Sequence, residues 1–228
     1  MTRPSPPESQ GIFSATRPLA LASASPRRQE FLRLLGLRFE VVRLTDIEPQ
    51  PQAGENPADY ALRAASAKAF AGARLRPDAF VLGADTVVAL DGEILGKPRD
   101  RRHALEMLLR LAGKSHVVLS ACCCRLPDGT VRTALGEARV HFFPWPPEVL
   151  AAYAASDEVL DKAGAYALQG RGAFLAQSVE GSVSAVVGLP MTQLVALLSD
   201  LGVIRANAAA CAQSGLTLRR HTRSRRRK

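Results

Sequence analysis

The sequence predicts one α/β domain whose mixed sheet is flanked by helices. Strand-like apolar runs alternate with amphipathic segments along most of the 228 residues, which is typical of an α/β fold. Two neighbouring runs, 115–126 and 130–143, flank Pro127-Asp128-Gly129 and therefore indicate a β-hairpin, which adds antiparallel strands. Apolar residues make up 47% of the chain, enough for one sizeable core, and the length fits a single α/β domain.

The first third of the chain is expected to alternate strand, helix, strand and helix. The expected strands cover 19–23 and 41–42, and the expected helices cover 28–35 and 57–74. Gly36 follows the first apolar periodicity and should end that helix. Asn56 precedes Pro57, an order typical of a capped helix start, and a polar, Pro-rich loop over 45–56 comes before it.

The run AFVLGADTVVAL, residues 79–90, is nearly all apolar and should form a central strand that ends at an Asp91-Gly92 turn. A glycine-rich loop over 161–173 should lead into two short strands. The remaining expected elements are helices over 100–111, 146–155 and 190–202 and strands over 174–179 and 183–188. This mixture predicts a mixed rather than a purely parallel sheet.

Both ends of the chain differ in composition from its middle. Residues 1–17 read as a flexible leader without the apolar stretch of a signal peptide, and no segment is apolar for long enough to span a membrane. Residues 205–228 read as a basic, disordered tail, and most of the net charge of +9 comes from 219–228. The tail is either simply solvated or contacts nucleic acid.

The cysteine pattern indicates reduced thiols. Cys122, Cys123 and Cys124 are consecutive within a strand-like run, and Cys211 is remote, so none has the Cys-x2–4-Cys spacing of a zinc site. Buried, reduced thiols are typical of a cytoplasmic protein.

The segment from Ser23 to Arg28, Ser-Ala-Ser-Pro-Arg-Arg, predicts an anion site where a strand meets a helix. Pro26 suits a first helical turn, whose free N–H groups attract anions. Ser23 and Ser25 add hydroxyl groups, and Arg27 adds a planar fork that suits phosphate. The alternative is an ordinary Ser-Pro helix start with surface arginines.

Asp85 lies inside the apolar central run. A carboxylate there is costly unless it is paired, protonated or metal-bound, so it could hold a divalent cation or accept a proton from water. Gly83 permits a close approach of another element. Glu48, in the polar loop, could join Asp85 in binding Mg²⁺. The alternatives are a hydrogen-bonded structural Asp85 and a solvated Glu48.

Three lysines and one amide complete the candidate site. Lys68 shares a helix face with small alanines and should therefore point inward to an anionic partner. Lys97 follows Gly96 and precedes Pro98, and Lys162 lies beside Asp161 ahead of the loop's glycines. The alternative for each lysine is a surface position without a role in the site. Gln169 closes that loop, and its amide could pair with the N3–H/O4 edge of uracil or thymine or could simply stabilise the loop.

These motifs together resemble the Maf family of nucleoside triphosphate pyrophosphatases. The resemblance covers about 19–202 and rests on LASASPRRQEFL, VLGADTVVALDGEILGKPRD, LDKAGAYALQGRGA and VVGLPM, in this order. It implies two lobes around a deep nucleotide cleft, related to inosine triphosphate pyrophosphatases, within a domain over 18–204. It also implies hydrolysis of a nucleoside triphosphate to the monophosphate and pyrophosphate with a divalent metal, Mg²⁺ or Mn²⁺, and a homodimer.

The resemblance also implies roles for single residues. Asp85 matches the general base and, with Glu48, the metal site. Arg27, Thr86 and Gln169 match positions that select the base. The phosphate-side positions that it implies are Ser23, Ser25, Arg27, Lys68, Lys97 and Lys162.

The loop with Gln169 resembles the branch that acts on dTTP and UTP, and modified pyrimidine nucleotides are also expected substrates. Ala167 stands where that branch usually has glycine. The alternative function is a nucleotide-binding regulator of cell division, an inhibitor of septum formation, without enzymatic activity.

Overall fold

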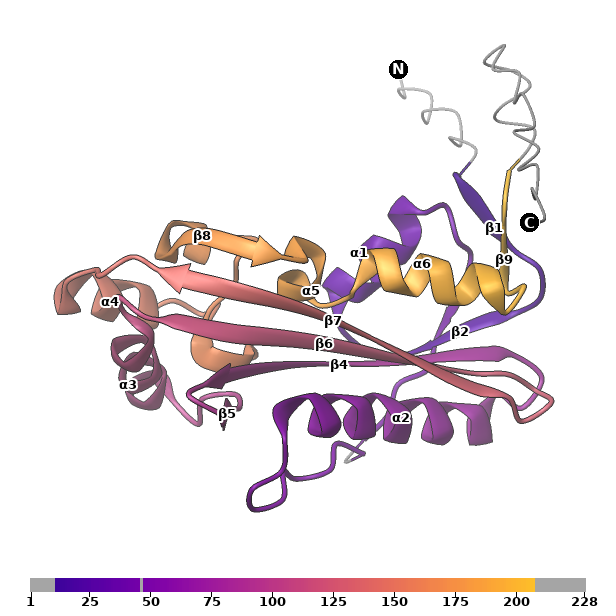
Figure 1. Cartoon of the computed structure of the whole chain (residues 1–228), viewed down its shortest axis with the longest axis horizontal. Helices are drawn as coiled ribbons and strands as arrows, with labels where there is room; N and C mark the ends of the chain where they lie inside the picture. Colours follow the sequence, from indigo (N-terminus) through magenta and orange to yellow (C-terminus); the bar gives the residue numbers. More distant parts are fainter. Residues whose placement is uncertain (1–10, 46, 208–228) are drawn as a thin grey trace, which may run out of the picture.

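The computed structural model describes residues 11–45 and 47–207, and a seven-stranded sheet forms its centre. The strand order is β3-β2-β4-β6-β7-β8, with β5 paired to β4, and the long strands β4, β6 and β7 run the length of the molecule (Figure 1). The strands are β2 Leu19–Ala22, β3 Glu40–Val41, β4 Phe80–Leu90, β5 Glu93–Leu95, β6 Ser115–Arg125, β7 Val131–Phe142 and β8 Ala176–Gly181.

The sheet is mixed, as the sequence predicts. β2 pairs in parallel with β3 and β4, whereas the other neighbouring pairs are antiparallel. The hairpin β6–β7 forms at Pro127-Asp128-Gly129, and the turn between β4 and β5 places Asp91 and Gly92 at φ 52° and 84°. These positive φ angles match the twist of a two-residue hairpin turn.

Helices cover both faces of the sheet. α2 (Pro57–Leu75) lies along one face, and α1 (Pro26–Leu34), α5 (Val183–Val187) and α6 (Met191–Asp200) lie on the other (Figure 1). The remaining helical segments lie at the end of the sheet away from β2 (Figure 1). They are α3 (Arg101–Leu111), α4 (Pro147–Ala154) and the 3₁₀ turns η1 (Ala163–Ala165) and η2 (Arg171–Leu175). The alanine face of α2 approaches β4 so closely that a Cβ at Gly83 would collide with the Ala65 carbonyl oxygen.

The core divides into two lobes along the sheet. In one lobe, Leu32 of α1 and Leu194 of α6 pack with Leu21 of β2. In the other, Leu108 of α3 and Leu150 of α4 pack against the opposite half of β4 and β6. The strands β4, β6 and β7 continue through both lobes, so they form a common floor (Figure 1).

Three expectations about elements were wrong. Residues 183–188 form a helix, α5, because Ser182 caps its start and Gly188 ends it at φ 137°. Phe13–Ala15, placed in the leader, forms β1 and pairs antiparallel with β9 (Ile204–Ala206), so Arg205 and Ala206 belong to a strand rather than to the tail. The strand expected over 174–179 begins only at Ala176 because η2 precedes it.

Residues 1–10 and 208–228, with most of the expected leader and tail and Cys211, lie outside the described residues. Cys122, Cys123 and Cys124 are buried and unpaired, and burial raises the pKa of the Cys122 and Cys124 thiols to about 12. In the described part of the chain, no helix is long and apolar enough to cross a bilayer.

Candidate active site

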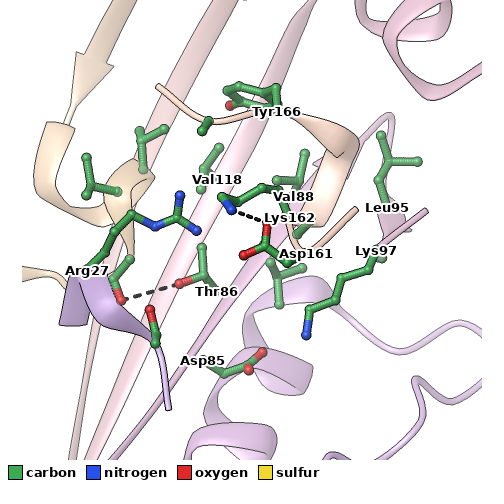
Figure 2. Close-up of a pocket in the computed structure, with 18 of the residues that line it drawn as sticks. Arg27, Asp85, Thr86, Val88, Leu95, Lys97, Val118, Asp161, Lys162 and Tyr166 are labelled. Carbon is green, nitrogen blue, oxygen red and sulfur yellow. Dashed lines mark hydrogen bonds and ion pairs between the residues drawn. The ribbon is translucent and has the colours of Figure 1, made fainter. Parts of the chain in front are cut away.

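A cavity of about 470 Å³ opens between the two lobes above the middle of β4. Apart from Ser23, every residue that the sequence proposes for the site lines it: Ser25, Arg27, Glu48, Lys68, Asp85, Thr86, Lys97, Lys162 and Gln169. Figure 2 shows Arg27, Lys97, Lys162 and Asp85 around the same space, although they come from separate segments of the chain. An apolar wall that includes Val88, Leu95 and Val118 completes the cavity.

Asp85 and Glu48 share one lysine at the base of the cavity. Lys68 Nζ donates to Asp85 Oδ1 at 2.5 Å and to Glu48 Oε2 at 3.0 Å. The close contact of the α2 alanines with β4 at Gly83 brings Lys68 within reach of Asp85. The prediction that Lys68 points inward to an anionic partner is therefore confirmed.

The two carboxyl groups differ in their surroundings. Burial raises the pKa of the Asp85 carboxyl, and the Lys68 and Arg28 cations oppose this only in part. Burial also acts upward on the pKa of Glu48, but Lys68 and Lys97 outweigh it and hold that pKa below its ordinary value. Asp85 is therefore the stronger base of the pair and Glu48 the more firmly ionised acid.

Arg28, which the sequence interpretation passed over in favour of Arg27, is the arginine that turns inward. Its guanidinium donates to the carbonyl oxygens of Gly188 at 3.0 Å and Ala84 at 2.8 Å. It also donates to the hydroxyl oxygens of Ser23 and Thr86, each at 3.1 Å. Arg28 therefore joins α1, β4 and the end of α5 at one edge of the cavity.

The helical period could have identified Arg28. Leu32 lies four residues later and is fully buried, so positions 28 and 32 share the face of α1 that meets the sheet. Arg27 lies about 100° away around the helix, and both arginines line the cavity.

The start of α1 has the features of the anion site that the sequence predicts, except that Ser23 does not face the cavity. Pro26 is the first helical residue and Ser25 the N-cap, and the Ser25 side chain makes no capping hydrogen bond, so its hydroxyl stays available to the cavity. Ser23 does not line the cavity. Its hydroxyl accepts hydrogen bonds from Arg28 and, at 3.3 Å, from the Ser25 N–H, so it supports the turn rather than facing the open space.

Lys97 and Lys162 come from two loops that are joined to each other. The Gly164 N–H donates to the Gly96 carbonyl oxygen at 3.1 Å, which holds the two loops together beside the cavity. Lys162 also forms an ion pair with Asp161 (Figure 2). The cavity therefore gathers five cationic side chains and three carboxylates, and the excess of positive charge favours an anionic ligand.

Gln169 stands on the rim, exposed, at the end of the glycine-rich loop. Its amide makes no hydrogen bond with any other residue in 11–45 or 47–207 and remains available for a ligand. Ala167 does not have a positive φ, so its Cβ causes no backbone strain. Positive φ angles occur earlier in the loop, at Gly164 (69°) and Ala165 (60°).

A buried histidine holds the start of this loop. His116 on β6 is 1% exposed, and its Nε2 lies 2.8 Å from the hydroxyl oxygen of Tyr166, a residue of the cavity wall. Burial, with a smaller effect from His141, lowers the pKa of His116 to about 4. The folded protein therefore keeps this ring neutral over a range in which the unfolded chain would protonate it.

We expect His116 to make the fold sensitive to acid. Its pKa is lower in the folded protein than in the unfolded chain, so its contribution is complete above about pH 6.5 and is lost as the pH falls toward 4. The full shift corresponds to roughly 3 kcal/mol. Thermal unfolding of His116→Gln should depend less on pH between 6.5 and 4 than that of the wild type. An equal pH slope in both proteins would contradict this assignment.

The carboxylates also fit a divalent cation. Asp85 and Glu48 each keep one oxygen that Lys68 does not bind, and Mg²⁺ typically takes one or two carboxylates and completes its shell with water and substrate phosphates. The described residues contain no cluster of three or more His, Cys, Asp or Glu that could hold a metal by themselves. A cation here would therefore complete its shell with water or with the substrate's oxygens.

Comparison with known proteins points to one family. Residues 18–201 match the family model Maf, described as Maf-like protein, and this range contains every residue of the cavity wall. A dTTP/UTP pyrophosphatase of Nitratidesulfovibrio vulgaris is 52% identical over 86% of this chain and 93% of its own length. A dTTP/UTP pyrophosphatase of Escherichia coli is 47% identical over 82% and 94%. A solved nucleoside-triphosphatase, dITP/XTP pyrophosphatase of Mycobacterium abscessus, aligns over 80% of this chain and 95% of its own with a TM-score of 0.43 at 19% identity.

Proposed function

Because the chain belongs to the Maf family, we propose that it is a pyrophosphatase that hydrolyses dTTP and UTP to the monophosphate and pyrophosphate. The observation that carries this proposal is the cavity itself. It brings five cationic side chains, three carboxylates and a free amide together from separate segments, which suits a triphosphate at one end and a base at the other. Modified pyrimidine nucleotides are proposed as further substrates.

The triphosphate occupies the cationic side of the cavity in this proposal. Ser25 and the first turn of α1 offer hydroxyl and N–H donors, and Arg27 offers a fork that fits phosphate oxygens. Lys97 and Lys162 lie on the two joined loops, where they neutralise the leaving pyrophosphate. The Gln169 amide pairs with the N3–H and O4 of thymine or uracil, and Thr86 stands beside Asp85 on β4 between the two ends.

Asp85 is the proposed general base. Oδ1 is bound to Lys68, so the second oxygen is the one that orients a water molecule and takes its proton. The water oxygen forms a bond to the α-phosphorus, the bond from that phosphorus to the bridging oxygen breaks, and pyrophosphate leaves with the electron pair. Lys68 keeps Asp85 in position and shares its charge with Glu48. Positioning and charge stabilisation supply most of the rate enhancement in phosphoryl chemistry of this kind.

Asp85 and Glu48 are the proposed ligands of a divalent cation, Mg²⁺ or Mn²⁺. The second Asp85 oxygen has two lone pairs, so it could contact the cation and the water together. Such a cation supplies positive charge to the phosphate oxygens and to the pyrophosphate as it leaves. Both carboxylates are placed at the cationic side of the cavity, next to Lys68, where a triphosphate would lie.

The enzyme is proposed to work in the cytoplasm, where nucleoside triphosphates are made and where the buried thiols stay reduced. Removal of unwanted nucleotides is the use that this reaction suggests. The homodimer stays a prediction.

The proposal is tested by pyrophosphate release from a panel of nucleoside triphosphates with Mg²⁺ or Mn²⁺. We expect dTTP and UTP to be hydrolysed at least about tenfold more efficiently than purine triphosphates, because adenine presents a different edge and guanine presents its matching edge farther from the sugar. Tight nucleotide binding without release from any member of the panel would instead support the regulator without enzymatic activity.

A further inference from the structure

The loop that carries Gln169 wraps around two side chains that stand outside the cavity, Tyr153 and Glu158. The Tyr153 hydroxyl accepts a hydrogen bond from the Ala167 N–H at 3.2 Å and donates to Glu158 Oε2 at 2.9 Å. Glu158 in turn accepts from the N–H groups of Arg171 and Gly172 at 3.2 and 3.1 Å. The Tyr153–Glu158 pair thus holds the backbone two residues before Gln169 and two and three residues after it.

Two glycines allow the loop to reach this pair. A Cβ at Gly170 would collide with Glu158 Oε1, and Gly170 also has a φ of 137°, which side chains rarely adopt. A Cβ at Gly172 would lie 2.5 Å from the Tyr153 hydroxyl oxygen. The backbone that follows Gln169 in sequence therefore lies directly against Tyr153 and Glu158, and the positions of these two side chains determine its path.

Tyr153 is a firm anchor for this contact. It belongs to α4, is 5% exposed and packs in the core of the lobe with α3, with its ring edge-on to Phe174 at a centroid distance of 6.1 Å. Neither Tyr153 nor Glu158 lines the cavity, so neither can touch a substrate there. The hydrogen bonds that the pair makes with backbone N–H groups go to this loop.

The position of Gln169 decides what its amide can recognise. The edge of guanine, O6 with N1–H, presents the same acceptor and donor as the O4 and N3–H of uracil and thymine. The guanine edge lies farther from the sugar because a purine has an additional ring. A glutamine amide can therefore distinguish guanine from uracil and thymine only by its distance from the sugar. The Gln169 side chain is exposed and makes no hydrogen bond with the other described residues, so its position is set by its backbone.

We propose that Tyr153 and Glu158 are positioning residues for base selection: they hold the Gln169 loop at the distance that suits a pyrimidine and stop it from withdrawing to admit guanine. This rests on the proposed function, since it assumes that the base lies at Gln169. Loosening the pair should relax selectivity for the base while the phosphate side of the cavity, anchored separately by the Gly164–Gly96 hydrogen bond, is retained.

The test compares Tyr153→Phe and Glu158→Gln with the control Asp157→Asn. Asp157 is adjacent in sequence, but its side chain is 96% exposed and pairs with Arg101, away from the loop. We expect the ratio of kcat/KM for UTP to that for GTP to fall about tenfold in both variants and to stay unchanged in the control. Inhibition of UTP hydrolysis by pyrophosphate, which has no base, should keep the same inhibition constant in all three.

Two results would overturn the proposal. One is an unchanged UTP-to-GTP ratio in variants that fold by circular dichroism. The other is an equal loss on both nucleotides together with weaker inhibition by pyrophosphate, which indicates general structural damage. If neither variant folds, Gly170→Ala decides, because a Cβ there collides with Glu158 Oε1 and disfavours the φ of 137°, so the loop and Glu158 cannot keep their present contact. The same fall in the ratio is then expected, and an unchanged ratio overturns the proposal.

Binding measurements separate this inference from the proposed function. Calorimetry with UMP and GMP reports base selection without turnover. A wild-type protein that prefers UMP but releases no pyrophosphate refutes the proposed function, and loss of that preference in the variants would still support the role of the pair. A wild-type protein without preference for UMP overturns the inference, whatever its activity.

Discussion

Asp85→Asn is expected to lower kcat about 10³-fold or more and to leave the fold intact. Asparagine keeps the shape of aspartate but cannot take a proton from water, and general base catalysis contributes about 10² to 10⁴ in rate. Stability should be unchanged or slightly higher, because burial already disfavours the charged form of Asp85 and raises its pKa. Lys68 retains Glu48 as an ionic partner in the variant.

Pyrophosphate release from dTTP and thermal unfolding measure the two halves of this prediction. Asp200→Asn, the same change at the exposed end of α6, serves as the control and should keep wild-type turnover. The wild-type rate should also fall on acidification at a pH above that expected for an ordinary aspartate, since its pKa is raised and only the ionised form accepts a proton. A fully active Asp85→Asn would remove Asp85 from the reaction and leave it a structural role.

Arg28→Met is expected to lower the free energy of unfolding by about 3–5 kcal/mol. Removing a buried, hydrogen-bonded charge leaves its partners without donors, and such changes are among the most destabilising single substitutions. Here the carbonyl oxygens of Ala84 and Gly188 would both lose the guanidinium that binds them. Arg28→Lys should recover only part of the loss, since one ammonium cannot reach every acceptor that the planar fork reaches.

Urea denaturation followed by circular dichroism measures this effect. Arg27→Met is the matched control: it makes the same change one residue earlier, at a side chain that faces the cavity, and should cost activity with little change in stability. Equal midpoints for wild type and Arg28→Met would show that the contacts of Arg28 carry little net energy. A midpoint lowered as much by Arg27→Met would show that the two arginines do not divide these roles.

Local pattern was sufficient wherever a residue's neighbours in sequence decide its environment. Asp85 was identified because a carboxylate within an apolar run needs a partner. Lys68 was identified because its helix face carries small alanines. Lys68 Nζ lies 2.5 Å from Asp85 Oδ1. The same reasoning placed Pro26 in a first helical turn and the β6–β7 hairpin at Asp128-Gly129, although the helix expected over 28–35 begins at Pro26.

The failures share a different cause. β1 is three residues long and pairs with β9, nearly 190 residues away, so no local periodicity announces it. The segment 183–187 has the composition of a strand, but its helix is held by the Ser182 cap and packs against β6 and β7. Tertiary contacts outweighed the weak β preference of a five-residue segment there.

The sequence by itself determined the mixed α/β class, the central strand with Asp85, the inward lysine and the motifs that identify the family, because burial cost and periodicity act over a few residues. Only the tertiary structure decided that Arg28 binds the carbonyl oxygens of Gly188 and Ala84, and that Tyr153 and Glu158 hold the Gln169 loop. The physical reason is that hydrogen bonds of buried groups are satisfied by whichever atoms the fold brings near. Gly188 lies 160 residues from Arg28, and its carbonyl meets that guanidinium only once α1 and α5 have packed on the sheet.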